Sequence, residues 1–157
     1  MNREELCELW PMLDGPLSLL EQWDGPRGII FESDPSSAFE AVSAVASMLG
    51  GHVEKFERHP VLKEDWEERA GRFIAGKVPP GALYEAKRDR LVVVLMDLER
   101  QPEWLQLKAK APMDRASKPG CDVRVLATSD DAAKIPDYVR SHFHVVRKTG
   151  RRRGAAT

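Results

Sequence analysis

The sequence predicts an α/β fold of three layers, in which helices cover both faces of a five-stranded, mainly parallel sheet. One observation is the run Leu91–Met96, six consecutive apolar residues that include three valines. A run this short and this apolar is typical of a strand buried on both faces, and such strands occur mainly in parallel sheets. A second observation is the repeated alternation of strand-like and helix-like segments, which is the pattern of parallel strands joined by right-handed crossovers.

Five segments have the apolar composition or the alternation that is typical of strands. The most apolar ones are expected in the middle of the sheet, where both faces are covered, and they lie at 28–32, 90–96 and 122–127. The remaining strands are expected at 52–57 and 143–147.

Apolar residues at helical spacing predict the connecting helices. Residues 2–23 carry Leu and Trp at this spacing, and breaks at Pro11 and at Gly15–Pro16 predict two short helices there. Asp34 or Ser36 can cap the next helix. That helix is expected to end at Gly50–Gly51, and a further helix is expected at 62–75, ended by Gly76. A short helical turn is expected at 82–87 and a helix opened by Pro102 after the central strand. An exposed loop is expected at 112–120, followed after the fourth strand by a helix that Asp130 caps and that runs through Val139.

Length and composition narrow the class of protein. A chain of 157 residues is expected to form one domain that buries about 70% of the surface of its unfolded form. The formal net charge of −1 does not favour a nucleic-acid coat or a membrane surface. Cys7 and Cys121 have no Cys-x-x-Cys spacing, and no apolar run approaches the ~18 residues of a membrane span. A cytoplasmic protein without disulfide, metal or membrane segment is therefore expected.

The exit of the first strand is the place to look for a ligand, because open α/β sheets bind ligands past the carboxyl ends of their strands. A phosphate loop there would have the sequence Gly-x-x-x-x-Gly-Lys-Ser/Thr. In register, its final Gly-Lys-Thr falls on Ala38, Phe39 and Glu40. A methyl, an aromatic ring and an acid thus replace the groups that hold phosphate, so a degenerate nucleotide site with no cofactor is expected.

Acidic residues follow the central strand at the position of a Walker-B motif. Asp97 ends the apolar run, but the adjacent acid of that motif is displaced to Glu99 across Leu98. These two residues are either a water-activating pair or strand-end acids of which Asp97 caps the following turn. The second interpretation is favoured, because the phosphate loop that such a pair would serve is missing.

The segment 127–143 resembles the sensor-1 and arginine-finger region of AAA+ proteins. It contains Ile135-Pro136, followed by Arg140-Ser141-His142. The resemblance implies that Asp130 stands near the usual sensor Asn and that His142 stands where the arginine finger would be. Both catalytic positions have changed, so the chain is expected not to be an enzyme. The same resemblance implies that strand 122–127 lies between strands 28–32 and 90–96.

A second stretch, Pro79–Val94, is similar to the Leu-Phe-x-x-(Lys/Arg)-x-Leu-Val-Val-Val segment of the bacterial DNA polymerase III clamp-loader delta subunit. Residues 29–35 resemble the opening strand of that subunit, which also lacks a working phosphate loop. The likeness covers about residues 27–147, with one extra residue between Leu83-Tyr84 and the strand. It implies that Leu83 and Tyr84 anchor a protein partner, either a DNA sliding clamp or other clamp-loader subunits. The chain stops where the lid and collar domains of delta would begin, which leaves pentamer assembly open.

Other chemistry has little support in the sequence. His142 and His144 would lie on one face of a strand but have no third metal ligand, so a structural or solvent-facing pair is favoured. No Gly-x-Ser-x-Gly motif indicates a nucleophile. The basic tail can neutralise phosphates or serve only as a solvated extension, and its candidate contacts are Arg151, Arg152 and Arg153.

The sequence thus predicts a helical extension at 1–26, an AAA+-like domain at 27–147 and a basic tail at 148–157. The leading hypothesis is a catalytically inactive domain that works in DNA replication by binding protein. One alternative is a nucleotide-binding or ATPase-type switch that still holds a phosphate ligand through backbone amides and Asp97. The other is a DNA-binding replication accessory that works through the tail.

Overall fold

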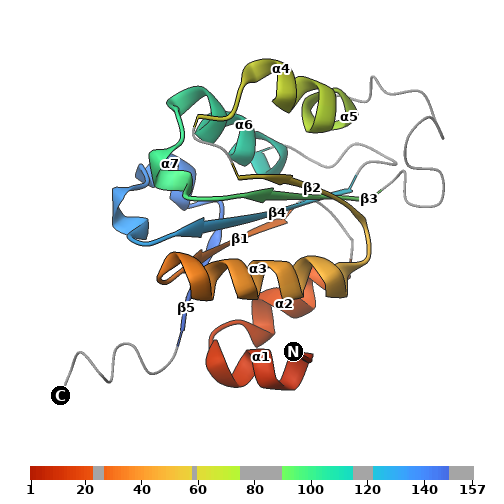
Figure 1. Cartoon of the computed structure of the whole chain (residues 1–157), viewed down its shortest axis with the longest axis vertical. Coiled ribbons are helices and arrows are strands. Elements are labelled where there is room, and N and C mark those ends of the chain that lie inside the picture. Colours follow the sequence, from red (N-terminus) through yellow and green to blue (C-terminus); the bar gives the residue numbers. More distant parts are fainter. Residues whose placement is uncertain (23–26, 58–59, 75–89, 115–121, 149–157) are drawn as a thin grey trace.

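The computed structural model describes residues 1–22, 27–57, 60–74, 90–114 and 122–148 of the chain. Within them, the strands form one five-stranded sheet in the order β2-β3-β4-β1-β5, and every pairing is parallel (Figure 1). The strands are β1 (Arg27–Glu32), β2 (His52–Phe56), β3 (Arg90–Leu95), β4 (Asp122–Ser129) and β5 (His144–Arg147). The predicted α/β class is confirmed, as is the position of β4 between β1 and β3.

Strand β4 is two residues longer than expected at its carboxyl end. Thr128 and Ser129 are polar, yet they pair in register with Phe31 and Glu32 of β1 and are only 1% exposed. Their backbone groups are satisfied by the neighbouring strand, which explains how polar residues can continue a buried strand.

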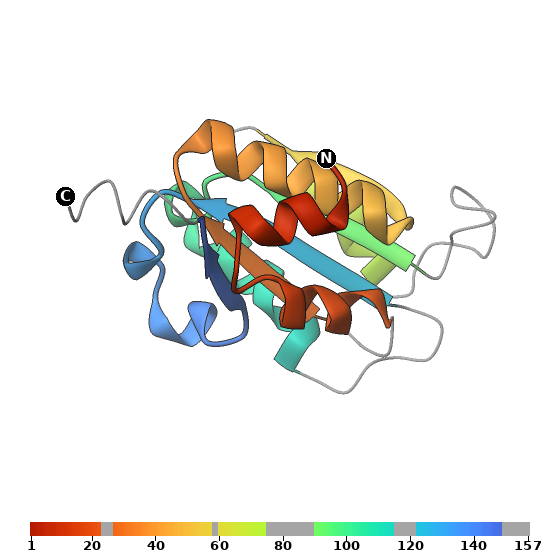
Figure 2. The same cartoon turned by 90° about the horizontal axis from the view of Figure 1, so that it is seen from below.

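One face of the sheet is covered by α1 (Arg3–Leu9), α2 (Asp14–Glu21) and α3 (Pro35–Leu49), as Figures 1 and 2 show. The two short N-terminal helices were predicted, but Gly15 and Pro16 lie inside the first turn of α2 and do not break it. Proline is tolerated there because the first turn has no intrahelical partner for its missing N–H. Trp10 packs edge-to-face on Phe31, with 5.4 Å between ring centroids, so these helices share the apolar core of the sheet.

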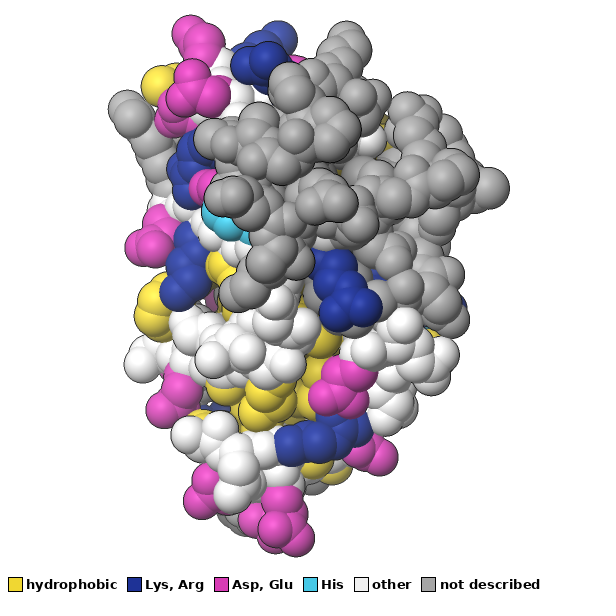
Figure 3. Space-filling view, turned by 90° about the vertical axis from the view of Figure 1, so that its right-hand side faces the viewer, with side chains coloured by type: hydrophobic (Ala, Val, Ile, Leu, Met, Phe, Trp, Pro, Cys, Tyr) yellow, Lys and Arg dark blue, Asp and Glu magenta, His cyan; other side chains and the backbone are white. Residues whose placement is uncertain are grey.

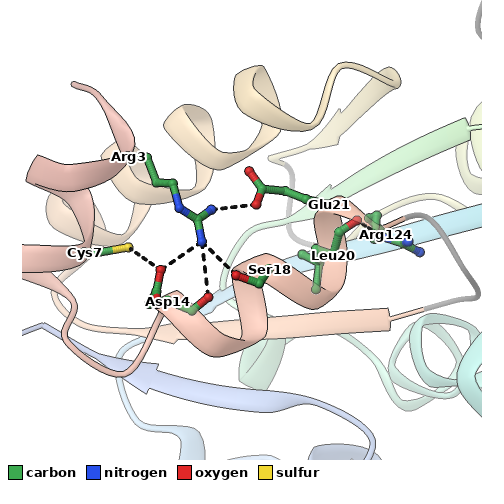
Figure 4. Close-up of polar contacts among 7 residues, drawn as sticks. All are labelled: Arg3, Cys7, Asp14, Ser18, Leu20, Glu21 and Arg124. Carbon is green, nitrogen blue, oxygen red and sulfur yellow. Dashed lines mark hydrogen bonds and ion pairs between the residues drawn. The ribbon is translucent and has the colours of Figure 1, made fainter.

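Arginine side chains tie the N-terminal helices together and to the sheet (Figure 4). From α1, the Arg3 guanidinium bonds Asp14 at 2.8 Å, Ser18 at 2.9 Å and Glu21 at 2.7 Å, all of them in α2. Arg124 of β4 is fully buried and its Nε donates to the carbonyl of Leu20 at 2.8 Å. A guanidinium at the carboxyl end of α2 is favourable for the helix dipole.

The other face is covered by a helical run and by α6 (Glu103–Asp114). The helix predicted at 62–75 is interrupted: α4 (Lys63–Trp66) passes into a π-helical turn η1 (Glu67–Gly71) and then into α5 (Arg72–Ile74). The loop predicted at 112–120 is wrong at its start, because α6 continues through Pro112 to Asp114, and residues 115–120 lie outside the described part of the chain. Pro112 lies in the last turn, where only one internal hydrogen bond is lost.

The segment between β4 and β5 also differs from the prediction. Asp131, and not Asp130, caps the short 3-10 helix η4 (Ala132–Lys134) by accepting from the amide of Ala133. The longer helix expected through Val139 is reduced to α7 (Asp137–Arg140). Pro136 separates the two, because a residue before proline disfavours the helical conformation.

Two predictions on helix ends are confirmed for α3. Asp34 is its N-cap, and Gly50 ends it in the left-handed conformation at φ 76°. The expected turn at 82–87 and the end at Gly76 lie outside the described residues. No helix among the described residues is long and apolar enough to cross a membrane.

Candidate functional site at the carboxyl edge of the sheet

The connection between β1 and α3 consists of two residues, Ser33 and Asp34. The Asp34 carboxylate accepts from the amide of Ser37 at 3.0 Å and from the hydroxyl of Ser33 at 3.1 Å. The hydrogen bond from the Ser37 amide is the largest cause that lowers the pKa of Asp34. A carboxylate of the chain itself therefore occupies the amino end of α3, where anions bind in folds of this kind.

The residues predicted to replace the phosphate loop lie farther along the helix. Because α3 begins at Pro35, Ala38, Phe39 and Glu40 belong to its second turn. Ala38 is fully buried against the sheet, whereas Glu40 is exposed and Phe39 is 38% exposed. The Lys55 ammonium lies 5.3 Å from the centroid of the Phe39 ring. The structure thus does not gather these three side chains around the amino end of the helix.

Asp97 turns the chain at the end of β3. Its backbone is left-handed at φ 52°, which aspartate tolerates better than most residues, and its amide donates to the Thr128 hydroxyl at 2.8 Å. The expectation that its carboxylate caps the next turn is wrong, since the 3-10 helix η3 (Leu98–Arg100) has no side-chain cap. The hydroxyl of Thr128 holds this turn in place instead.

The carboxylates of Glu99 and Asp130 both lie within ion-pair distance of the Arg100 guanidinium. Arg100 Nη2 is 3.3 Å from Asp130 Oδ2, and Arg100 Nε is 3.8 Å from Glu99 Oε2. The Glu99 side chain is only 3% exposed, compared with 38% for that of Asp130. Burial raises the pKa of Glu99, and the neighbouring Asp130 carboxyl group raises it further.

Glu32 joins β1 to the elements beside it. One carboxylate oxygen accepts from the amide of Ala132 at 2.6 Å, and the other forms an ion pair with Arg147 of β5. Next to it, the Lys148 ammonium donates to the Ser37 hydroxyl at 3.0 Å. The bonds of Glu32 link β1 to η4, which follows β4, and to β5.

The segment that resembles an arginine-finger region uses its arginine internally. Arg140 Nη1 donates to the carbonyls of Ala132 and Ile135 at 3.1 and 3.0 Å, and Nη2 pairs with Asp137. His142 is half-buried. In the described part of the chain, no three His, Cys, Asp or Glu side chains gather into a potential metal site.

The structure places Asp97 after β3, bonded through its amide to Thr128, and Asp130 after β4, paired with Arg100. Phe39 and Glu40 lie away from the start of α3. Leu83, Tyr84, Arg151, Arg152 and Arg153 lie outside the described residues. Sequence reasoning missed Glu32, Arg100 and Thr128. An acid or a hydroxyl in the last two positions of a strand is the signal that could have found Glu32 and Thr128.

An open cavity of about 550 Å³ lies elsewhere, on α1 and the start of α2, and is lined by Arg3, Glu4, Cys7, Glu8 and Asp14. Burial raises the pKa of the Cys7 thiol, which keeps it protonated. Because Arg3 is already bound by Asp14 and Glu21, the cavity offers no free cation to a ligand.

Solved structures provide comparisons for the whole fold. A point mutant of RuvB from Thermotoga maritima has a TM-score of 0.60 at 9% identity, over 94% of this chain and 45% of that one. A DNA polymerase III gamma subunit-related protein from the same organism has a TM-score of 0.58 at 16% identity, over 84% of this chain and 45% of that one. A third structure, RuvB from the same organism described as a Holliday junction branch migration motor, has a TM-score of 0.58 at 11% identity, over 94% of this chain and 45% of that one.

The chain spans less than half the length of these solved chains. No protein-family model matches it, and the search of curated proteins gives no match. At such low identity the structural neighbours establish the fold only. The likeness to the clamp-loader delta subunit rests on sequence segments alone. The strand order β2-β3-β4-β1-β5, together with these neighbours, shows that the chain has an AAA+-type α/β fold.

Proposed function

We propose that this chain is a catalytically inactive AAA+-like domain that works in DNA replication by binding another protein, and that the partner is a DNA sliding clamp. The observation that carries the proposal is the two-residue connection between β1 and α3. A phosphate loop has four variable residues between its two glycines alone, so it does not fit into this connection. The Asp34 carboxylate, held by the Ser37 amide, would also repel a phosphate group from the helix end.

The rest of the edge supports the same conclusion. Arg140 is bonded to two backbone carbonyls and Asp137, and Arg100 lies against Asp130 and Glu99. Arg140 and Arg100 are therefore already engaged with groups of the chain and are not available to compensate a triphosphate. If the domain does not bind or hydrolyse a nucleotide, recognition of another macromolecule is the function that we favour for it.

The class of partner comes from resemblance. One structural neighbour is described as related to the gamma subunit of DNA polymerase III, and the stretch Pro79–Val94 is similar to the clamp-loader delta subunit. By that similarity, Leu83 and Tyr84 are the anchor pair for a pocket on the clamp. A leucine and an aromatic ring are a common hydrophobic anchor, because each contributes roughly 1.5–3 kcal/mol when it is buried.

Calorimetry with ATP and magnesium tests the absence of nucleotide chemistry. We expect no binding tighter than roughly millimolar, because the motif's cation and hydroxyl are missing. Asp34→Asn is the matched variant, since it keeps the cap but removes the charge. If this variant also fails to bind, the charge of Asp34 is not what excludes the nucleotide, and the short connection and the missing cation and hydroxyl are sufficient. A micromolar dissociation constant for the natural chain would instead favour the nucleotide-switch hypothesis.

Binding to the host's sliding clamp tests the partner. Replacing Leu83 and Tyr84 by Ala should weaken binding by ~10² to 10⁴ without changing the unfolding temperature. A matched control replaces Leu62 and Tyr138, an exposed leucine and an exposed tyrosine on the described surface, at 41% and 49%. Clamp binding that is equal in the anchor variant and the control variant would contradict the proposal.

A DNA-binding accessory is the second candidate, and the basic cluster at Arg151, Arg152 and Arg153 favours it. On the side of the molecule drawn in Figure 3, described charged side chains of both signs are interspersed. If the tail contacts duplex DNA, deletion of 148–157 should weaken DNA binding and lower the salt slope of binding by about 0.9 per lost contact. An unchanged slope would leave the tail as a solvated extension.

A further inference from the structure

Glu99, Arg100 and Asp130 form a charged cluster in which one acid is buried, the other is exposed and both contact the same guanidinium. Glu99 lies in η3, after β3, and Asp130 directly follows β4, so the two acids lie in the segments that leave two neighbouring strands of the sheet. One carboxylate is almost completely buried and the other is open to solvent, at 3% and 38% exposure. A single described guanidinium, that of Arg100, lies within ion-pair distance of both.

The groups around Glu99 can be named element by element. From its own turn, Arg100 Nε is 3.8 Å away, which is an ion-pair contact but too long for a hydrogen bond. From β4, the Ser129 hydroxyl, which also accepts from the amide of Asp131, lowers the pKa of Glu99, whereas the carboxyl group of Asp130 raises it. Neither oxygen of Glu99 has a hydrogen bond of good geometry among the described residues, and burial, which raises the pKa of this carboxyl group, is the largest influence on it.

Neighbouring acids at this edge differ from Glu99. Glu32 of β1 is bound by Arg147 and by the amide of Ala132. Asp34 is bound by the amide of Ser37. Such bonds hold a carboxylate in its ionised form, whereas a buried carboxyl group without them is more stable with a proton.

Arg100 is free to change position, because its side chain is 60% exposed. Its 3.3 Å contact with Asp130 is at the long end of the hydrogen-bond range. If Glu99 loses its proton, a buried negative charge appears beside this guanidinium. The attraction between them is stronger than that to a solvent-exposed carboxylate, since a buried pair is less screened.

We propose that Glu99 and Asp130 form a proton-linked switch for Arg100. While Glu99 carries its proton, Arg100 pairs with Asp130. When the proton leaves to solvent, Arg100 turns to Glu99 and Asp130 becomes an unpaired, exposed carboxylate at the edge of the sheet. The switch does not depend on the identity of the partner, so it stands or fails separately from the proposed function.

An NMR titration from roughly pH 4 to pH 8 tests the switch in the full chain. We expect the carboxyl carbon of Glu99 to titrate above the ordinary value of 4.5, and the Nε–Hε signal of Arg100 to move with the same midpoint. Arg140 is the matched control, because its guanidinium is bound by two backbone carbonyls and by Asp137 and does not contact Glu99. Its signal should not move at that midpoint.

Two variants separate the switch from a general effect of pH. Glu99→Gln should abolish the response of Arg100, and Asp130→Asn should lower the midpoint of Glu99, since one neighbouring negative charge is gone. The proposal is overturned if Glu99 titrates at or below its ordinary value. It is equally overturned if the Arg100 signal follows no midpoint of Glu99, or if it responds unchanged in Glu99→Gln.

Discussion

The two faces of the sheet are buried by different means. On the face of α1, α2 and α3, the core consists of aliphatic residues from regular helices, with Trp10 against Phe31 as its aromatic contact. On the face of α4, η1, α5 and α6, the helical run is broken by a π-helical turn, and polar side chains fix the elements. Gln106 Nε2 donates to the carbonyl of Leu98 at 2.9 Å, and Gln101 Nε2 donates to that of Met96 at 3.1 Å.

Arg69 is the clearest case on the second face. It projects from η1, forms an ion pair with Glu54 at 2.7 Å, stacks 4.3 Å over the Phe56 ring and donates to the carbonyl of Lys55. The carbonyl of Phe56 accepts from Met96, so the alternate carbonyl of Lys55 points to the open edge of β2. The first face thus combines regular amphipathic helices with the bond from Arg124 to Leu20, whereas the second has an irregular helical run held by several side-chain hydrogen bonds.

The largest expected effect tests both faces at once. Val92 and Val93 are fully buried neighbours on β3 that belong to opposite cores. Val92→Asp and Val93→Asp should each unfold the domain, because an unpaired buried carboxylate costs several kcal/mol against a total stability of about 5–15 kcal/mol. Far-UV circular dichroism and thermal melting measure this. If either variant still melts cooperatively near the natural temperature, that face is not a closed core.

Large cavities should weaken the two faces about equally. Trp10 is 1% exposed and Trp66 is 2% exposed. Trp10→Ala and Trp66→Ala should each lower the free energy of unfolding by about 3–5 kcal/mol, as measured in urea. A loss under about 1 kcal/mol for Trp10→Ala would mean that the N-terminal helices are a detachable extension of the 27–147 domain.

The polar anchor should distinguish the faces. Arg69→Met keeps the apolar stem but removes the ion pair with Glu54 and the bond to the Lys55 carbonyl, so the free energy of unfolding should fall by about 2 kcal/mol. The matched control is Arg72→Met on the exposed surface of α5, which should stay within about 0.5 kcal/mol. Equal losses in both variants would show that the contacts of Arg69 do not stabilise the second face.

The smallest expected effect concerns the cap of α3. Asp34→Ala should cost about 1 kcal/mol at neutral pH, while Asp34→Asn, which keeps an acceptor, should cost less. Because the folded pKa of Asp34 is lowered, its ionised carboxylate stabilises the fold above the ordinary value of 3.8, and this stabilisation is lost as the pH falls through the lowered value. Melting curves of the natural chain and both variants, recorded from neutral pH down through the pKa of Asp34, measure the effect. A stability loss on Asp34→Ala that grows toward low pH would contradict this prediction.

Sequence reasoning succeeded where a local pattern determines the structure. The apolar run at 91–96 predicted β3, and Asp34 was one of two predicted caps of α3, with Ser36, because a cap bonds a residue only three positions away. The π-helical turn was missed, because η1 keeps nearly the same apolar spacing as an ordinary helix. Asp131 was missed as a cap in favour of Asp130, a difference of one residue that composition does not resolve.

The candidate site was harder to predict, because its bonds join distant parts of the chain. Glu32 and Ala132 are 100 residues apart, and Asp97 and Thr128 are 31 apart. The register that placed Ala38, Phe39 and Glu40 at a phosphate loop assumed a loop between strand and helix. The helix starts immediately after Asp34, so the alignment by motif was displaced along α3.

The short connection after β1 also limits how this protein could change. Point substitutions within 33–40 can restore a glycine, a lysine and a hydroxyl, but they cannot lengthen the backbone between Glu32 and Pro35. An insertion would have to move the start of α3 while Ala38, Ala41 and Val42 stay packed on the sheet. Conversion of this chain into a nucleotide-driven motor would therefore require an insertion and a rebuilt helix start together, a path that single mutations do not open.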